Sequence, residues 1–199
     1  MTEAAQLKIL RTSPEIRELL ERDFDFEPLK VVASSRLFQF SGNGSCELIA
    51  TDASGGEFAL CQSDKSNRPV LYVSSEGQAG IIARSLEEGL STMAAIPHWH
   101  DCLKFSGGGQ LDEMRRVFPF SEAEALEEVP HLDSSRRILR IRLELPVLND
   151  PVYSLYSAVT ELTPYFPVQG TDGLPFSGLF NKFTVLSNPV WRRKFSELS

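Results

Sequence analysis

Short apolar runs separated by turn-forming residues occupy the first half of the chain and predict a set of β-strands. The runs lie at residues 29–33, 36–40, 46–50, 57–61 and 70–73. Gly, Asn, Asp and Ser stand between them, and these residues favour tight turns. Because consecutive strands with short links usually pair with each other, we expect an antiparallel meander. The last run, Val-Leu-Tyr-Val, is apolar throughout, which indicates a central strand.

Apolar positions spaced three to four residues apart predict helices on either side of the strands. Ser13 followed by Pro14 suits a helix start, since serine caps the first turn and proline loses no hydrogen bond there. The apolar stripe that follows continues to about Asp23. Asp150 and Pro151 repeat the same start, so we expect a second such helix there.

The stretch after the predicted strand at 70–73 favours a long helix. Ser75 and Gln78 have the spacing of a capping box, and an apolar stripe then runs to about Ala95. Further on, residues 111–118 predict a short helix, and the glutamates of residues 122–128 predict a solvated helical face.

The remaining patterns are shorter. Residues 140–145 alternate strictly between polar and apolar, which predicts a half-buried strand. Residues 182–186 predict a last strand and residues 191–195 a terminal helical turn. The run Ser-Gly-Gly-Gly at 106–109 is typical of a hinge or linker.

These elements predict an α+β fold, mainly an antiparallel sheet with helices packed on one face. We expect a core domain over residues 1–130 and a C-terminal extension or subdomain, packed on the core, over residues 131–199. Charge changes at this boundary. The first part carries 21 acidic and 12 basic side chains, a net charge of −9, and the second carries 6 and 8, a net charge of +2.

The acidic first part bears on the class of partner. A net negative charge disfavours binding to phosphate backbones, so no nucleic-acid partner is expected. It favours encounter with a basic protein, although the same charge is also explained by solubility without any partner. No run of 18 apolar residues occurs, so no membrane span is expected.

Cysteine use and the N-terminus indicate a cytoplasmic protein. Residues 1–13 lack the apolar segment and cleavage site of a secretion signal. Three cysteines without Cys-x-x-Cys spacing, Cys46, Cys61 and Cys102, argue against a disulfide framework or a zinc ribbon. Cys61 stands in an apolar strand, which indicates an inert core thiol.

Residues 98–102, His-Trp-His-Asp-Cys, form the most conspicuous chemical cluster. A metal site would need a third ligand beside His98 and His100. However, the cluster follows a proline and is expected to open a short helix, in which residues two apart point in different directions. We therefore predict a packing corner with Trp99 and Leu103 inside and the histidines outside, and no metal or cofactor.

Local motifs within residues 50–103 resemble SUKH-type domains. They are Gly55-Gly56 with the strand to Leu60, then residues 69–73, then Ile82-Ala-Arg-Ser-Leu86 and the segment to Trp99. That superfamily includes bacterial immunity proteins of polymorphic toxin systems and yeast cell-wall-synthesis regulators. The resemblance implies a non-catalytic α+β protein that acts by binding a partner. In the immunity members the partner is a toxin domain, often a nuclease or a deaminase.

The functional hypothesis is therefore an immunity protein that neutralises a cognate and basic protein toxin by direct binding. Acids on the loops and at the expected helix start are the candidate partner-binding residues: Asp52, Glu57, Asp64 and Glu76. Two alternatives stay open. One is a metal-dependent enzyme that uses His98, His100 and the loop at 164–180, and the other is a cytoplasmic scaffold or regulator with the same fold.

Overall fold

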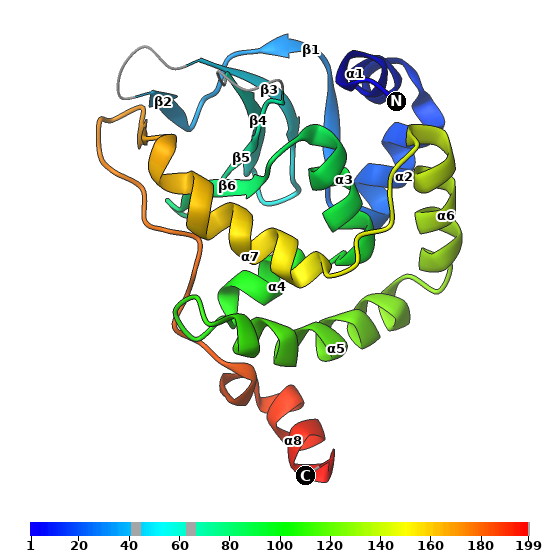
Figure 1. The fold of residues 1–199 in the computed structure, drawn as a ribbon, viewed down its shortest axis with the longest axis vertical. Helices are drawn as coiled ribbons and strands as arrows, with labels where there is room; N and C mark the ends of the chain where they lie inside the picture. Colours follow the sequence, from blue (N-terminus) through cyan, green and yellow to red (C-terminus); the bar gives the residue numbers. More distant parts are fainter. Residues whose placement is uncertain (41–44, 63–66, 199) are drawn as a thin grey trace.

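The computed structural model describes residues 1–40, 45–62 and 67–198 (Figure 1). The helices are α1 (Glu3–Thr12), α2 (Pro14–Phe24), α3 (Leu86–Ala95), α4 (Trp99–Lys104), α5 (Leu111–Glu128), α6 (Leu132–Leu143), α7 (Pro151–Leu162) and α8 (Pro189–Leu198), with 3₁₀ turns η1 (Thr163–Tyr165) and η2 (Val185–Ser187). The strands are β1 (Glu27–Ala33), β2 (Phe38–Phe40), β3 (Cys46–Thr51), β4 (Glu57–Cys61), β5 (Val70–Val73), β6 (Ala79–Ala83) and β7 (Val168–Gly170).

The predicted α+β class and antiparallel sheet are confirmed. Five strands pair antiparallel in the order β1-β3-β4-β5-β6, and β2 pairs with β7 in a separate two-stranded sheet. Helices pack against the five-stranded sheet, and α8 lies at the end of the molecule far from β1 (Figure 1). None of the helices in the described ranges has the length and apolar content needed to cross a bilayer.

Both faces of the central strands are covered. One face packs against the helices in a large apolar cluster that includes Phe58, Tyr72 and Ile82. The other face contributes Leu71 and Ile81 to a smaller cluster completed by side chains of β2, β7 and the segment after α7. This double coverage explains why β4, β5 and β6 are buried along their whole length.

The C-terminal part shares the main core. Leu139 of α6, Leu155 of α7 and Trp191 of α8 belong to the same apolar cluster as the sheet residues. The proposed division between residues 130 and 131 stays a prediction, because a shared core does not by itself define a domain boundary.

The helix predicted from Ser75 to Ala95 is wrong in its first half. Ser74 N donates to Gln78 O (2.8 Å) in a turn, and residues 79–83 then form β6 beside β5. The helix begins only at α3, where Ser85 Oγ accepts from Glu88 N at 3.1 Å. The capping-box pattern that begins at Ser75 therefore lies in a turn. The residue that caps the helix is Ser85, ten residues later.

Other short patterns were also misread. Residues 140–143 belong to α6, whose buried stripe includes Leu132, Leu139 and Leu143. The alternation of polar and apolar residues resembled a strand because Ile141, an apolar residue, lies on the solvent-exposed side of this helix. The strand predicted at 182–186 is absent, and η2 occupies its end. Helix α1 and strand β7 were not predicted.

The glycine run before α5 is bonded to the C-terminal part, so it is no free linker. Gly107 N donates to Phe183 O (2.7 Å), and Gly108 N donates to Asn181 O (2.8 Å). Helix α5 itself runs unbroken across the two helical patterns predicted at 111–118 and 122–128, with Pro119 inside it. The predicted helix starts at Pro14 and Pro151 are confirmed.

The expectation against a disulfide is wrong, because Cys46 and Cys61 are joined. The register of β3 and β4 places these residues directly opposite each other, with Cα atoms 4.2 Å apart. Side chains of such a pair leave the same face of the sheet, so the two sulfur atoms meet. Cys61 is thus a bridge partner and not the inert thiol expected, whereas Cys102 is buried and free.

Breaking this bridge is expected to lower the free energy of unfolding. A bridge that closes a loop of 15 residues contributes about 3 kcal/mol. Chemical denaturation with and without reductant measures the effect in the natural chain and in a Cys46→Ser variant. Reductant should destabilise the natural chain alone, and an equal response of both proteins would contradict the prediction.

Candidate functional site

A cavity of about 730 Å³ opens where five separate segments of the chain meet. These segments are the corner after α2, the β3–β4 turn, the β5–β6 turn, α4 and the stretch from Ser177 to Phe183. The last of these is held against α4, since Asn181 N donates to Leu103 O at 3.2 Å. Figure 1 shows this C-terminal segment passing α4 on its way to α8. The volume lies within the range of about 300–1,000 Å³ common for ligand sites.

The floor of the cavity is built on the buried carboxylate of Asp52. Its Oδ1 accepts from Ser54 Oγ (2.7 Å) and Gly56 N (2.8 Å), and its Oδ2 accepts from Tyr72 Oη (2.7 Å). Burial raises the pKa of Asp52, but these hydrogen bonds outweigh it and hold the net pKa below its usual value. The carboxylate is therefore ionised at neutral pH.

Tyr72 and His100 complete the floor. Burial, and then the hydrogen bond to Asp52, raise the pKa of Tyr72, so its hydroxyl remains a donor. The His100 ring stacks on Trp99, with centroids 3.6 Å apart, and meets Tyr72 edge-on at 5.0 Å. The floor of the cavity thus combines the aromatic rings of His100 and Tyr72 with the ionised carboxylate of Asp52 beneath them.

His100 carries a buried nitrogen without a hydrogen-bond partner among the described residues. Its Nε2 lies 4.0 Å from Asp52 Oδ2, which is too long for a hydrogen bond. The side chain as a whole is 39% exposed, so the ring presents a surface to the cavity while Nε2 faces inward. Burial lowers the pKa of His100 to about 4, although Asp52 and Asp25 oppose the shift.

The depressed pKa of His100 makes stability dependent on pH. Between its usual pKa of 6.5 and about 4, the unfolded chain binds more protons than the folded one, so stability falls as pH falls. We expect the imidazole resonances of His100 to titrate near pH 4. We also expect the loss of unfolding free energy from pH 7 to about 4.5 to be smaller in His100→Gln than in the natural chain.

His98→Gln is the matched control for this measurement, because His98 lies outside the cavity lining. A titration midpoint of His100 near 6.5, its usual value, would contradict the account of its burial.

Two exposed acids add negative charge to the cavity. Asp25 ends α2 in the left-handed conformation (φ 48°), and its Oδ1 accepts from Ala53 N at 2.8 Å. That bond holds the carboxylate against the β3–β4 turn. Glu76 stands on the exposed β5–β6 turn. Lys104 also lines the cavity, and its Nζ lies 5.5 Å from the centre of the Phe105 ring.

The structure brings together two of the four acids proposed from the sequence. Asp52 and Glu76 line the cavity, although Asp52 is buried and Glu76 lies on a turn instead of a helix start. Glu57 is buried elsewhere and accepts hydrogen bonds from Ser35 Oγ and from Arg36 N (2.9 Å). Asp64 lies outside the described residues. Of the three acids that the structure describes, Glu76 is the exposed one at this cavity, whereas Asp52 is buried in its floor.

The packing corner predicted at residues 98–102 is confirmed for Trp99 and Leu103, which are buried at the start and near the end of α4. The histidines diverge, as expected for residues two apart on a helix. His98 Nε2 lies 3.3 Å from Glu128 Oε2, and His100 faces Asp52. Over residues 1–40, 45–62 and 67–198, no three His, Cys, Asp or Glu side chains are grouped to hold a metal ion.

Cys102 is unsuited to nucleophilic chemistry. Burial raises the pKa of its thiol to about 12, so the thiolate is absent at neutral pH.

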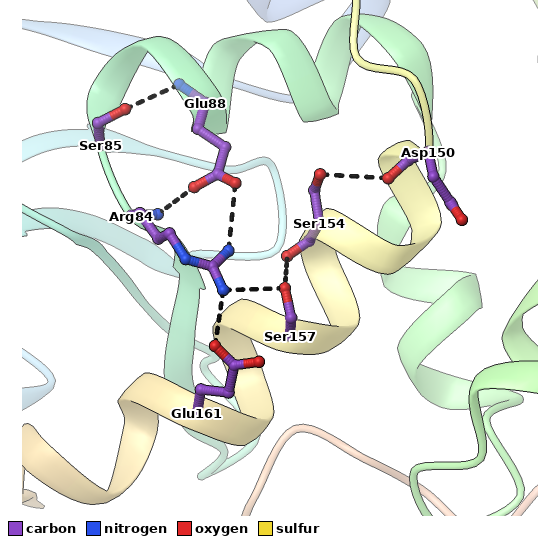
Figure 2. Close-up of polar contacts among 7 residues, drawn as sticks. All are labelled: Arg84, Ser85, Glu88, Asp150, Ser154, Ser157 and Glu161. Carbon is purple, nitrogen blue, oxygen red and sulfur yellow. Dashed lines mark hydrogen bonds and ion pairs between the residues drawn. The ribbon is translucent and has the colours of Figure 1, made fainter.

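A second polar cluster joins the sheet to α7 (Figure 2). From the end of β6, Arg84 Nη2 donates to Ser157 Oγ (3.1 Å) and Glu161 Oε2 (2.8 Å), and Nη1 contacts Glu88 Oε1 at 3.3 Å. Figure 2 shows the guanidinium between α3 and α7 with its donors directed at these oxygens. Because the guanidinium is engaged internally, we interpret this cluster as a clamp that positions α7.

Comparison of the chain with protein-family models, with curated proteins and with solved structures found no match.

Proposed function

We propose that this protein is a non-catalytic binding module, an immunity protein that neutralises a basic protein toxin by direct contact. The supporting observation is the acidic cavity, whose floor is an ionised buried carboxylate and whose edge carries Asp25 and Glu76. The local resemblance of residues 50–103 to SUKH immunity proteins supplies the class of partner.

Electrostatics favours a basic partner. The whole chain has a net charge of −7, which attracts cationic surfaces over several ångströms and speeds encounter. His100 is neutral at neutral pH and does not offset Asp52. Lys104 is the cationic side chain among the described lining residues, against the acids Asp25, Asp52 and Glu76.

The edge of the cavity also offers an apolar contact. Phe183 lines it and is 51% exposed, although large aromatic side chains are ordinarily buried. Aromatic residues of this kind often contribute a large share of the binding energy at protein interfaces. An exposed aromatic beside a negatively charged cavity suits a protein partner better than a small polar substrate.

Co-expression with any toxin that is encoded by a gene adjacent to this one tests the proposal. Protection of the host cells and co-purification of the two chains are expected. Asp25→Asn/Glu76→Gln should weaken the complex at least about tenfold, since two charges at the contact are removed. Glu18→Gln/Glu21→Gln removes the same charge from exposed positions of α2 outside the cavity lining. The proposal is excluded if the natural chain neither protects the cells nor binds the toxin.

A further inference from the structure

We propose that the C-terminal end of the molecule docks on the surface of an anionic lipid bilayer. This inference goes beyond the proposed function and concerns a surface outside the floor of the cavity. It follows from exposed apolar side chains, a local excess of positive charge and a rigid position at one end of the molecule. We call this region the C-terminal surface, and its exposed residues are Lys182, Phe183, Leu186, Val190, Arg192 and Arg193.

The first feature is a group of large apolar side chains that face solvent. Phe183, Leu186 and Val190 are 51%, 52% and 43% exposed. In the same stretch, Val185 and Trp191 are each 1% exposed, so the segment already turns its inner apolar side chains toward the core. Apolar side chains that gather on an exposed surface with polar residues around them are typical of protein or membrane contacts.

These side chains lie close together because their segment is arranged around Phe105. The ring of Phe183 lies 6.2 Å from that of Phe105, and the ring of Trp191 in α8 lies 4.8 Å from it. Leu186 stands in η2, on the connection between Phe183 and Trp191. The ammonium group of Lys104, an exposed residue, lies 5.5 Å from the centre of the same Phe105 ring. The apolar residues therefore share this end of the molecule with a cation from α4.

The second feature is the charge of residues 182–194. This segment contains no acid and four basic side chains, which are Lys182, Arg192, Arg193 and Lys194. Within residues 1–40, 45–62 and 67–196, none of the four has an ion-pair partner. The whole chain has a net charge of −7, but repulsion from its acids is screened beyond about 8 Å at physiological ionic strength. Each basic side chain at an anionic bilayer strengthens binding about fivefold, so the segment itself is attracted at contact.

The third feature is a rigid position at one end of the long axis of the molecule, where α8 lies far from β1 (Figure 1). The ring of Trp191 lies 4.8 Å from that of Phe105 and 6.1 Å from that of Phe120, and its Nε1 donates to Glu124 Oε1 at 2.6 Å. A surface that is already ordered binds without the cost of ordering it.

A bilayer fits these features better than an acidic protein does. The boundary between headgroups and acyl chains accepts apolar and basic side chains at the same time. A soluble acidic chain would engage the basic side chains but would leave Phe183, Leu186 and Val190 in water. The end of the molecule can also approach a flat surface while the acidic first part of the chain points away from it (Figure 1).

Co-sedimentation of the full chain with lipid vesicles tests the inference without a toxin. One set of vesicles holds equal parts of phosphatidylserine and phosphatidylcholine, and the other holds phosphatidylcholine alone. Binding to the anionic set should be at least about tenfold tighter. It should weaken as the ionic strength rises from about 0.01 M to about 0.1 M, because the screening length falls from about 30 Å to about 10 Å. Equal binding to both sets, or none to the anionic set, would overturn the inference.

Charge variants locate the contact. Arg192→Gln/Arg193→Gln should weaken binding to the anionic vesicles at least about tenfold. Lys8→Gln/Lys30→Gln is the matched control, because it removes the same charge from exposed positions of α1 and β1. The control should bind like the natural chain, and an equal loss in both variants would contradict docking through the C-terminal surface.

Apolar variants separate a bilayer from a soluble acidic partner. Leu186→Ser/Val190→Ser keeps Phe183, which also lines the cavity, and should weaken vesicle binding at least about tenfold because less apolar area is buried. Val31→Ser/Val32→Ser, at positions 72% and 65% exposed on β1, should leave it unchanged. Poly-glutamate should bind far more weakly than the anionic vesicles. Equally tight binding of poly-glutamate would assign the surface to acidic proteins and overturn the inference.

Discussion

Replacing Arg136 by methionine is expected to lower the free energy of unfolding by about 4 kcal/mol, the scale seen when a buried ion pair loses one partner. The guanidinium is buried on α6 and donates from two nitrogens to Glu122 of α5, both at 2.7 Å. Its Nε donates to the carbonyl of Ala94 at the end of α3 (2.8 Å). Methionine fills much of the same space but leaves both acceptors without their donors.

Chemical denaturation of the variant measures this effect, with Arg137→Met as the matched control. Arg137 is the next residue of the same helix and is exposed, so its replacement should change stability by less than about 0.5 kcal/mol. The double variant Arg136→Met/Glu122→Met should recover part of the loss, since it removes the carboxylate that the single variant leaves unpaired. A loss below about 1 kcal/mol in Arg136→Met, the size of an exposed ion pair, would show that the contacts of Arg136 with Glu122 and Ala94 do not act as a buried ion pair.

Strands β4 and β5 were predictable because their signals are local and consistent. The segments at 57–61 and 70–73 are short, apolar and bounded by turn residues, and they became β4 and β5 almost residue for residue. The start of α3 was not predictable from the same kind of signal. Ser75–Gln78 and Ser85–Glu88 both fit a capping box, and only the second begins a helix. Residues 79–83 pair with β5 as strand β6, so the helix cannot begin at Ser75. This pairing is a tertiary contact, which the local pattern does not contain.

Gly80 illustrates how that tertiary contact works. A Cβ at this position would lie 2.9 Å from Leu179 Cδ1, so the strand approaches a segment about a hundred residues away too closely for a side chain. In a sequence, such a glycine looks like a weak point in a helix. Its actual role depends on a residue that local periodicity cannot connect to it.

The candidate site was only partly predictable for the same reason. Asp52 stood out because it begins a turn between two clear strands, and Trp99 because it follows a helix-ending proline. Asp25 and Tyr72 carried no local signal of a site, since each completes a regular element. They reach the cavity because α2 and β5 end beside the β3–β4 turn. A site assembled from five distant segments leaves no spacing motif in the sequence.

The second large effect is expected at Gly56, where alanine should lower the free energy of unfolding by about 4 kcal/mol, roughly half from overpacking and half from a broken buried hydrogen bond. A Cβ there would lie 2.6 Å from Tyr72 Oη and would also collide with Asp52 Oδ2. Both atoms are buried, and the hydrogen bond between them forms the floor of the cavity. Neither can withdraw without exposing Asp52 or displacing the Tyr72 ring, which packs on Phe58 and Trp99.

This substitution also tests whether the floor controls the site. In Gly56→Ala the Asp52–Tyr72 hydrogen bond is lost, so the surroundings of His100 change and its resonances should move at neutral pH without any ligand. Gly178→Ala is the matched control, because a Cβ at that position meets nothing within 4 Å. It should leave stability and the His100 resonances nearly unchanged. If Gly56→Ala is as stable as Gly178→Ala, the turn has room for a side chain at this position, and the close contact that we assign to Gly56 is wrong.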